Sequence, residues 1–294
     1  MGFIPGRGVA LNRGHPLARD LLMWHSFDEG TGAFLFDASG HGRHGATWTD
    51  LDSSNWIPGD NRLGWAIDSD GASSNIAVTE AGWLETSKAF SVMVWAYVST
   101  ANRCLARLTT TDNFYLIANA TPALRATVGG TAVTAGAAMT ADTWHCAVIT
   151  YDKTNVRIYQ DGLLVGGPTS ATGTYNAADT WSWSHATGEL DGSYGQGAAW
   201  QRALSEGEVQ QLCREPWVLF ETQAIAASST PGALTKMESH PYPALGGSVI
   251  GADARLVCPQ DNDSVTHSPK YMVIVRGVQV PASGNFELTL SQEA

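Results

Sequence analysis

The stretch VRIYQDGLLV, residues 156–165, decides the fold class of this chain. Apolar and polar residues alternate over 156–160, which is the two-residue period of a half-buried β-strand. Asp161 and Gly162 separate this run from a second apolar run. An Asp-Gly pair between two such runs is the strongest short-range signal for a β-hairpin with a two-residue turn. The segment therefore predicts two antiparallel strands joined by a tight turn.

Short apolar runs like these recur on the N-terminal side of the hairpin. Residues 21–27, 90–98 and 144–151 are three of them, and clusters of Gly, Asp, Asn and Thr separate them. Strands at this spacing, with no helices between them, indicate an antiparallel all-β sandwich. No apolar run reaches the length of a transmembrane helix, so no membrane partner is expected.

One short helix is predicted after the last of these strands. Ser205 precedes Glu208 by three residues, which is the capping-box pattern of a helix N-terminus. A narrow apolar face follows, formed by Val209, Leu212 and Cys213. Pro216 ends the pattern. We expect this helix to lie on the surface of the sandwich.

The charge balance argues against nucleic acid as a partner. The 294 residues include 17 basic and 28 acidic side chains, which gives a net charge of -11. Such a balance repels a phosphate backbone. The N-terminus lacks the apolar core of a signal peptide, and the cysteines lack any zinc-binding spacing. Four reduced thiols are therefore expected: Cys104, Cys146, Cys213 and Cys258.

Composition divides the chain into three parts. Residues 1–14 hold four glycines and a proline without periodicity, which predicts an extended N-terminal arm. Residues 15–222 contain the strand pattern of the main domain. Residues 223–294 begin with a small, polar linker and continue with strand-like runs at 271–275 and 286–290, which predict a small β-rich extension. An extension so poor in large side chains is expected to lean on the main domain or on another chain.

Four segments, taken in order, resemble one family. They are LLMWHSFDEGTGAFLFDASGHGRHGAT (21–47), FSVMVWAYVS (90–99), WHCAVITYDKTNVRIYQDGLLV (144–165) and AAWQRALSEGEVQQL (198–212). Together they resemble a laminin-G-like, concanavalin A-like jelly roll over residues 15–222. The resemblance implies two curved antiparallel sheets packed face to face, with a concave face that relatives often use for glycans or proteins. The chain also resembles the variants of this domain in tailed bacteriophage structural proteins, in which an ALS-x-x-E helix precedes a segment like REPWVLFE (214–221).

The loop DASGHGRHGA, residues 37–46, is the first candidate site. In the family that the chain resembles, a DxSGxxxxG segment joins the first strands, and some relatives bind calcium near this rim. Asp37 is then a candidate calcium ligand. In relatives, a late strand carries an acidic pair, but those positions hold Gly195 and Gln196 here, so Asp191, slightly upstream, is the second candidate ligand. Calcium needs six to eight oxygen ligands, generally including several carboxylates. In the alternative, Asp37 caps backbone amides in a turn whose glycines adopt positive φ.

The same loop offers two histidines as candidate ligands of a transition metal. His41 and His44 stand three residues apart, and no third partner can be identified in the sequence. A flexible, glycine-rich loop is a poorly preorganised metal site. No cofactor is therefore predicted, and calcium is the one alternative left open.

An enzymatic role is not expected. Concanavalin A-like glycoside hydrolases carry a Glu-x-Asp-x-x-Glu pattern on one strand. Glu189 and Asp191 resemble the beginning of that pattern. Tyr194 stands where the second glutamate belongs. Retaining hydrolysis needs two carboxyl groups about 5–5.5 Å apart, so the pattern lacks one of its two working groups.

Two of the eleven tryptophans are candidate ligand-binding residues. Trp181 and Trp183 are two apart in TWSWSH and share one face of a strand. Exposed indole rings in this arrangement form a stacking platform for a sugar. In the alternative, they cover the sheet or a neighbouring subunit.

Two functions follow as expectations. The first is a non-enzymatic virion structural protein, assembled in the host cytoplasm, that decorates a capsid, tail or fibre. Its N-terminal arm and C-terminal extension then contact other virion proteins, its jelly roll binds glycans of the host surface, and it forms a homo-oligomer. The second is a stand-alone carbohydrate-binding module.

Overall fold

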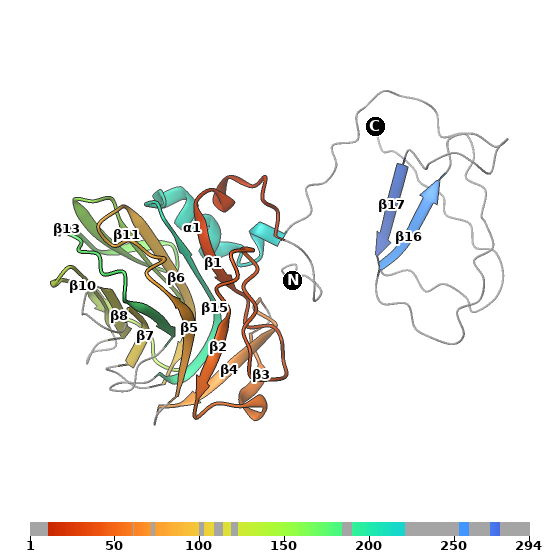
Figure 1. The fold of residues 1–294 in the computed structure, drawn as a ribbon, viewed down its shortest axis with the longest axis horizontal. Coiled ribbons are helices and arrows are strands. Elements are labelled where there is room, and N and C mark those ends of the chain that lie inside the picture. Colours follow the sequence, from red (N-terminus) through yellow and green to blue (C-terminus); the bar gives the residue numbers. More distant parts are fainter. Residues whose placement is uncertain are drawn as a thin grey trace. The chain divides into compact units, whose positions relative to one another are not determined.

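The computed structural model describes residues 11–60, 62–71, 74–99, 103–108, 114–118, 123–183 and 190–220, and the backbone of 253–258 and 271–276. The chain divides into two compact units, Met1–Ile225 and Ala226–Ala294. The first unit is a sandwich of two antiparallel sheets (Figure 1). This architecture confirms the all-β prediction.

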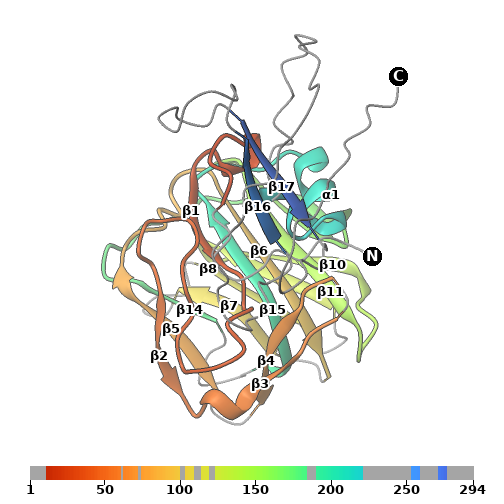
Figure 2. The ribbon, with the colours of Figure 1, turned by 90° about the vertical axis from the view of Figure 1, so that its right-hand side faces the viewer.

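One sheet has eight strands, and β15 lies at its centre. The order is β13-β12-β11-β6-β15-β4-β3, and β1 pairs with the C-terminal half of β15 beside β4 (Figure 2). The strands are β1 (Leu21–His25), β3 (Trp56–Pro58), β4 (Trp65–Asp70), β6 (Phe90–Val98), β11 (Trp144–Tyr151), β12 (Asn155–Gln160), β13 (Leu163–Ser170) and β15 (Asp191–Trp200).

The second sheet has seven strands in the order β10-β9-β8-β7-β14-β5-β2. Its inward residues and those of the eight-stranded sheet form one hydrophobic core between the layers. The strands are β2 (Gly45–Thr49), β5 (Asn75–Ala81), β7 (Arg103–Leu108), β8 (Phe114–Ala118), β9 (Ala123–Val128), β10 (Thr131–Ala138) and β14 (Thr180–Trp183).

The hairpin predicted at residues 156–165 is confirmed as β12 and β13. Asp161 and Gly162 are the two turn residues, with φ of 53° and 85°. Positive φ at both positions is the signature of a type I′ turn, whose twist matches that of the flanking strands. Asp161 also accepts a hydrogen bond from the backbone N–H of Cys146 (2.9 Å), which joins the turn to β11.

A second hydrophobic core covers the outer face of the eight-stranded sheet. Three short helices pack there: η1 (Pro16–Ala18), α1 (Glu206–Arg214) and η3 (Val218–Phe220). The predicted capping box of α1 is confirmed, because Ser205 and Glu208 each accept a hydrogen bond from the other's backbone N–H. A further turn, η2 (Ser53–Asn55), lies before β3. No helix among the described residues is long and apolar enough to span a membrane.

A disulfide joins Cys146 of β11 to Cys213 of α1. The expectation of four reduced thiols is therefore wrong for this pair, whereas Cys104 is a buried thiol. The apolar face of α1 packs on the outer face of β11, and this contact brings together two cysteines that are 67 residues apart. Spacing along the sequence could not reveal that contact.

Both terminal segments are described only in part. Residues 1–10 of the expected arm lie outside the described residues, and Leu11 is buried in the second core. Asn12 donates a backbone hydrogen bond to the carbonyl of Leu219 (2.7 Å). In the second unit, β16 (Asp253–Cys258) pairs with β17 (Tyr271–Arg276), which confirms the predicted strand at 271–275. The run at 286–290 lies outside the described residues.

Candidate functional site

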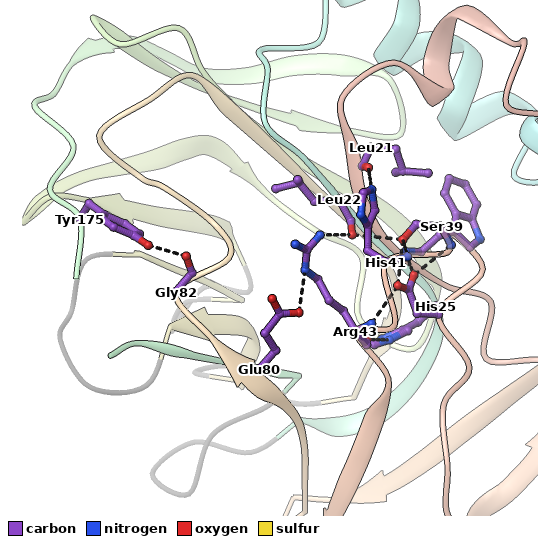
Figure 3. A network of polar contacts seen from close by, with 11 residues as sticks. Leu21, Leu22, His25, Ser39, His41, Arg43, Glu80, Gly82 and Tyr175 are labelled. Atoms are coloured by element: carbon purple, nitrogen blue, oxygen red, sulfur yellow. Dashed lines mark hydrogen bonds and ion pairs between the residues drawn. The ribbon is translucent and has the colours of Figure 1, made fainter. Parts of the chain in front are cut away.

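The carboxylate of Asp37 holds the DASGHGRHGA loop together, and Figure 3 shows Ser39, His41 and Arg43 of this loop beside His25. The Asp37 carboxylate accepts backbone hydrogen bonds from Trp24 (3.0 Å), Ser39 (2.9 Å) and Arg43 (3.0 Å), and a fourth from the Ser39 hydroxyl (2.8 Å). The side chain is only 2% exposed. Burial alone would raise the pKa of Asp37, but these hydrogen bonds outweigh it and lower the pKa. Both oxygens are thus engaged in organising the turn.

The two candidate calcium ligands do not meet. Asp37 forms an antiparallel β-bridge with His25 of β1, and His25 pairs with Gly197 near the C-terminal end of β15. Asp191 is the first residue of β15 and so lies at the opposite end of that strand. Six residues of strand separate Gly197 from Asp191, which is roughly 20 Å at about 3.4 Å per residue. Asp191 lies 3.8 Å from the Arg103 guanidinium. The turn interpretation therefore accounts for the bonds of Asp37, and Asp191 does not lie beside it.

The loop histidines are bound within the protein. His41 Nε2 lies 3.1 Å from the Leu21 carbonyl (Figure 3). His44 Nδ1 accepts a hydrogen bond from the backbone N–H of Asp37 (3.0 Å). Within the described part of the chain, no group of three or more His, Cys, Asp or Glu side chains could hold a metal ion. These two imidazoles stabilise the turn.

His25 lies fully buried beside this turn. Its Nδ1 accepts a hydrogen bond from Trp183 Nε1 (2.8 Å), so its proton resides on Nε2, which donates to the Arg43 carbonyl (2.8 Å). In a protonated ring, the N–H at Nδ1 would face the N–H of Trp183 Nε1, and this hydrogen bond would be lost. Burial is the main cause that lowers the pKa of His25 to about 4, helped by nearby His44 and opposed by Asp37 and the Arg43 carbonyl.

We expect the stability of the sandwich to fall on acidification because of His25. Between pH 6.5 and 4 the unfolded chain binds a proton at this ring and the folded chain does not. The contribution is thus complete above pH 6.5 and declines by about 3 kcal/mol as the pH reaches 4. The imidazole NMR resonances of His25 should titrate with a midpoint near 4. A midpoint above 6 would contradict the buried, neutral assignment.

Glu29 has the opposite effect on stability and must be removed from that measurement. Burial raises the pKa of its carboxyl to about 7, because Oε2 is buried without a hydrogen-bond partner among the described residues. Its contribution to stability is present below pH 4.5 and is lost as the pH rises through 7. Urea unfolding of the Glu29→Gln variant at several pH values therefore removes this opposing contribution from the decline caused by His25.

Trp181 and Trp183 both lie in the core between the sheets. Each is 0% exposed, and their rings are in edge contact with centroids 5.1 Å apart. They do share one strand face, as the sequence predicts, but it is the inward face. A sugar-stacking platform formed by these two rings is therefore wrong.

The outward face of the seven-stranded sheet belongs to neither hydrophobic core, although Ser182 and Thr127 on this face are buried. Strand register places Ala77, Ser182, Arg107, Tyr115 and Thr127 in one row across β5, β14, β7, β8 and β9. Their neighbours in sequence point into the core. The outer face of the eight-stranded sheet, in contrast, is covered by the second core. This row is the candidate ligand-binding surface.

Arg125 extends the row along β9. It lies two residues from Thr127 on the same strand face, and its Cζ is 5.8 Å from the centroid of the Tyr115 ring. Both side chains are half-buried. The Thr127 hydroxyl is buried and has no hydrogen-bond partner among the described residues. A cation, an aromatic face and an unsatisfied hydroxyl thus lie side by side.

A second group of exposed aromatic rings lies in the connection between β1 and β2. Phe34 and Phe36 are 41% and 60% exposed, and Leu35 between them is buried. The His44 ring lies between the two, with centroid distances of 5.0 and 4.9 Å. The backbone N–H of Phe36 donates a hydrogen bond to Glu29 Oε1 (2.6 Å), so a carboxylate lies beside this cluster, whereas the row around Tyr115 has a cation beside its aromatic ring.

The residues of the suspected hydrolase pattern do not form a carboxylate pair among the described residues. Glu189 lies outside those residues. Asp191 lies beside Arg103, and the buried Tyr194 donates its hydroxyl hydrogen bond to the Cys104 carbonyl (3.0 Å). Tyr194 is therefore part of the core packing.

Sequence reasoning missed Tyr115 and Arg125, although a signal for them exists. In ALRATV the polar residues Arg125 and Thr127 stand at alternate positions, which places them on one face of the strand, and in FYLIA Tyr115 is the one residue with a polar group. The sequence cannot tell which strands are neighbours, so the meeting of these two side chains follows only from the sheet order.

Comparison with known proteins agrees with this architecture. Residues 70–210 match the Laminin_G_3 family model, described as the concanavalin A-like lectin/glucanases superfamily. The sandwich is a concanavalin A-like jelly roll. This confirms the predicted fold class, and it supports the laminin-G-like resemblance over residues 70–210. No curated protein matches the chain.

Solved structures show the same concanavalin A-like fold at low identity. The binding domain of Paraclostridial Mosquitocidal Protein 1 has a TM-score of 0.52 and 16% identity, over 69% of this chain and 53% of that one. Trypanosoma rangeli sialidase in complex with sialic acid has a TM-score of 0.51 and 12% identity, over 68% and 34%. Domain 4 of the GH43 extracellular arabinanase AbnA from Geobacillus stearothermophilus, in complex with arabinotriose, has a TM-score of 0.51 and 15% identity, over 66% of this chain and 98% of that one. This chain thus spans about half or less of the first two structures.

Proposed function

We propose that this chain is a non-enzymatic carbohydrate-binding protein of a virion, and that the outward face of its seven-stranded sheet holds the glycan. The observation that carries this proposal is the row of Arg107, Tyr115 and Thr127, extended by Arg125. Sugar sites combine an aromatic face with a few placed polar groups, and this row supplies both.

The arrangement of the two sheets supports the choice of face. The helices η1, α1 and η3 seal the other sheet with apolar side chains, and the disulfide fixes α1 there. The similarity to domain 4 of the arabinanase, a structure in complex with arabinotriose, supports a saccharide as the ligand class.

The virion assignment rests on the sequence and on the disulfide. The segment 214–221 resembles bacteriophage structural proteins, and structural disulfides persist on virion and cell surfaces. Contacts with other virion proteins through the N-terminal arm and the C-terminal unit, and assembly into a homo-oligomer, belong to the same proposal. A stand-alone module would instead remain a monomer, which light scattering of the full chain distinguishes.

Replacing Tyr115 by alanine tests the binding face. The full-length protein is applied to an array of neutral and acidic glycans, and the best glycan is measured by calorimetry. Because truncation of a central aromatic contact commonly costs more than 1 kcal/mol, we expect Tyr115→Ala to weaken binding by about tenfold or more.

Phe36→Ala is the matched control, since this exposed ring lies outside the row. It should leave the affinity unchanged. Loss of binding in Phe36→Ala with none in Tyr115→Ala would move the site to the cluster of Phe34, Phe36 and His44.

A further inference from the structure

The row around Tyr115 is cationic in a strongly acidic protein. The chain carries a net charge of -11, yet the five neighbouring strands β10, β9, β8, β7 and β14 contain three arginines and no Asp or Glu. Two of these arginines, Arg107 and Arg125, lie on the outward face on either side of β8. A local positive field of this kind selects for an anionic ligand.

Arg125 is the group best placed to meet such a ligand. Arg103 lies beside Asp191, whereas no carboxylate of the described residues pairs with Arg125. Its guanidinium leans toward Tyr115, with Cζ 5.8 Å from the ring centroid, which brings the charge to the middle of the row. A ligand that contacts the Tyr115 ring therefore also lies within reach of the Arg125 guanidinium.

Thr127 adds an independent sign of an unfilled site. Its side chain is 3% exposed, and its Oγ1 is buried without a hydrogen-bond partner in the described part of the chain. A buried hydroxyl without a partner costs about 1–3 kcal/mol, so its presence beside Arg125 and Tyr115 calls for a polar partner. A sugar hydroxyl or ring oxygen meets that need.

We infer that this face is specific for acidic saccharides, with the Arg125 guanidinium binding the sugar carboxylate and the Tyr115 ring packing against the sugar face. The inference rests on the proposed glycan-binding function and names its ligand class. Guanidinium is the group whose planar fork matches a carboxylate with two parallel hydrogen bonds. Uronic and sialic acids share this carboxylate, and the experiment separates them.

The test uses four saccharides and the full-length protein. Trigalacturonate and sialyllactose carry the carboxylate, and galactotriose and lactose are their neutral counterparts. Calorimetry at low salt should show at least tenfold tighter binding of one acidic saccharide than of its neutral counterpart. Its affinity should decline as NaCl is raised from about 0.05 to 0.5 M, since exposed charges are then screened.

Variants of Arg125 identify the group responsible. Arg125→Gln should remove the preference by reducing acidic-saccharide affinity about tenfold, while neutral-saccharide affinity changes less than twofold. Arg125→Lys should retain only part of the preference for acidic saccharides, because an ammonium is a point charge without the planar fork of the guanidinium. Arg19→Gln removes the same charge at a side chain that is 74% exposed, and it should have no effect.

Several outcomes would overturn the inference. Equal affinity for acidic and neutral saccharides, or an acidic preference that survives in Arg125→Gln, contradicts it. Tighter binding of a sulfated disaccharide than of both carboxylated saccharides contradicts the choice of carboxylate. Neutral saccharides bound in a Tyr115-dependent manner, without acidic preference, would leave the proposed function standing. Binding of no saccharide on the array would reject both.

Discussion

Replacement of Trp183 by alanine is expected to reduce the free energy of unfolding by about 5 kcal/mol. Large-to-small changes of a buried tryptophan cost about 3–5 kcal/mol through lost burial and the remaining cavity. Trp183 also loses the hydrogen bond from Nε1 to His25 Nδ1 (2.8 Å), which leaves a buried acceptor unpaired. Urea unfolding followed by circular dichroism measures the change.

The phenylalanine variants separate the hydrogen bond from the packing. Trp183→Phe removes the Nε1 donor, whereas Trp181→Phe removes an Nε1 that has no partner among the described residues. Both rings are fully buried, so their packing losses are comparable. Trp183→Phe should cost about 1 kcal/mol more. Equal losses would show that the bond to His25 contributes nothing to stability.

Asp37→Ala is expected to cost about 4 kcal/mol. The substitution leaves the buried backbone N–H groups of Trp24, Ser39 and Arg43 without their acceptor, and each such group costs about 1–3 kcal/mol. Asp37→Asn keeps one acceptor oxygen and should lose roughly half as much. The unfolding midpoint in urea, at a constant slope, reports these differences.

Asp52→Ala is the control for an ordinary cap. Asp52 accepts hydrogen bonds from Ser54 at the exposed start of η2, so its loss should lower the free energy of unfolding much less than the loss of the buried Asp37. The calcium interpretation of Asp37 makes a different prediction. If a chelator lowers the melting temperature of the wild type and not of Asp37→Ala, a bound ion rather than the turn explains the role of this carboxylate.

Local patterns in the sequence predicted local structure well. The Asp161-Gly162 turn and the Ser205–Glu208 capping box involve residues a few positions apart, and the structure confirms both. The reason is physical, since turn conformation and end-capping depend on the backbone of neighbouring residues. The fold class followed because the spacing of such signals repeats along the chain.

Features that depend on the order of strands could not be predicted. Alternation placed Trp181 and Trp183 on a common face but did not say that this face points inward. The candidate site pairs Tyr115 with Arg125 across two strands, and the disulfide pairs Cys146 with Cys213 across the second core. Each of these contacts is set by tertiary packing, for which a single sequence has no local signal.

The strand order also determines which edges the sandwich presents to other copies of the chain. An exposed sheet edge is a template for a foreign strand. On one side of the sandwich, β10 and β13 lie against each other, and Gly166 of β13 closely approaches the Thr134 backbone. On the other side the edges are β2 and β3, which are five and three residues long, and β3 ends at Pro58, which has no N–H to donate. Among the described strands of the sandwich, neither side offers a long unpaired ladder, so the sandwiches of two copies are expected to associate through side-chain surfaces and not through continued sheets.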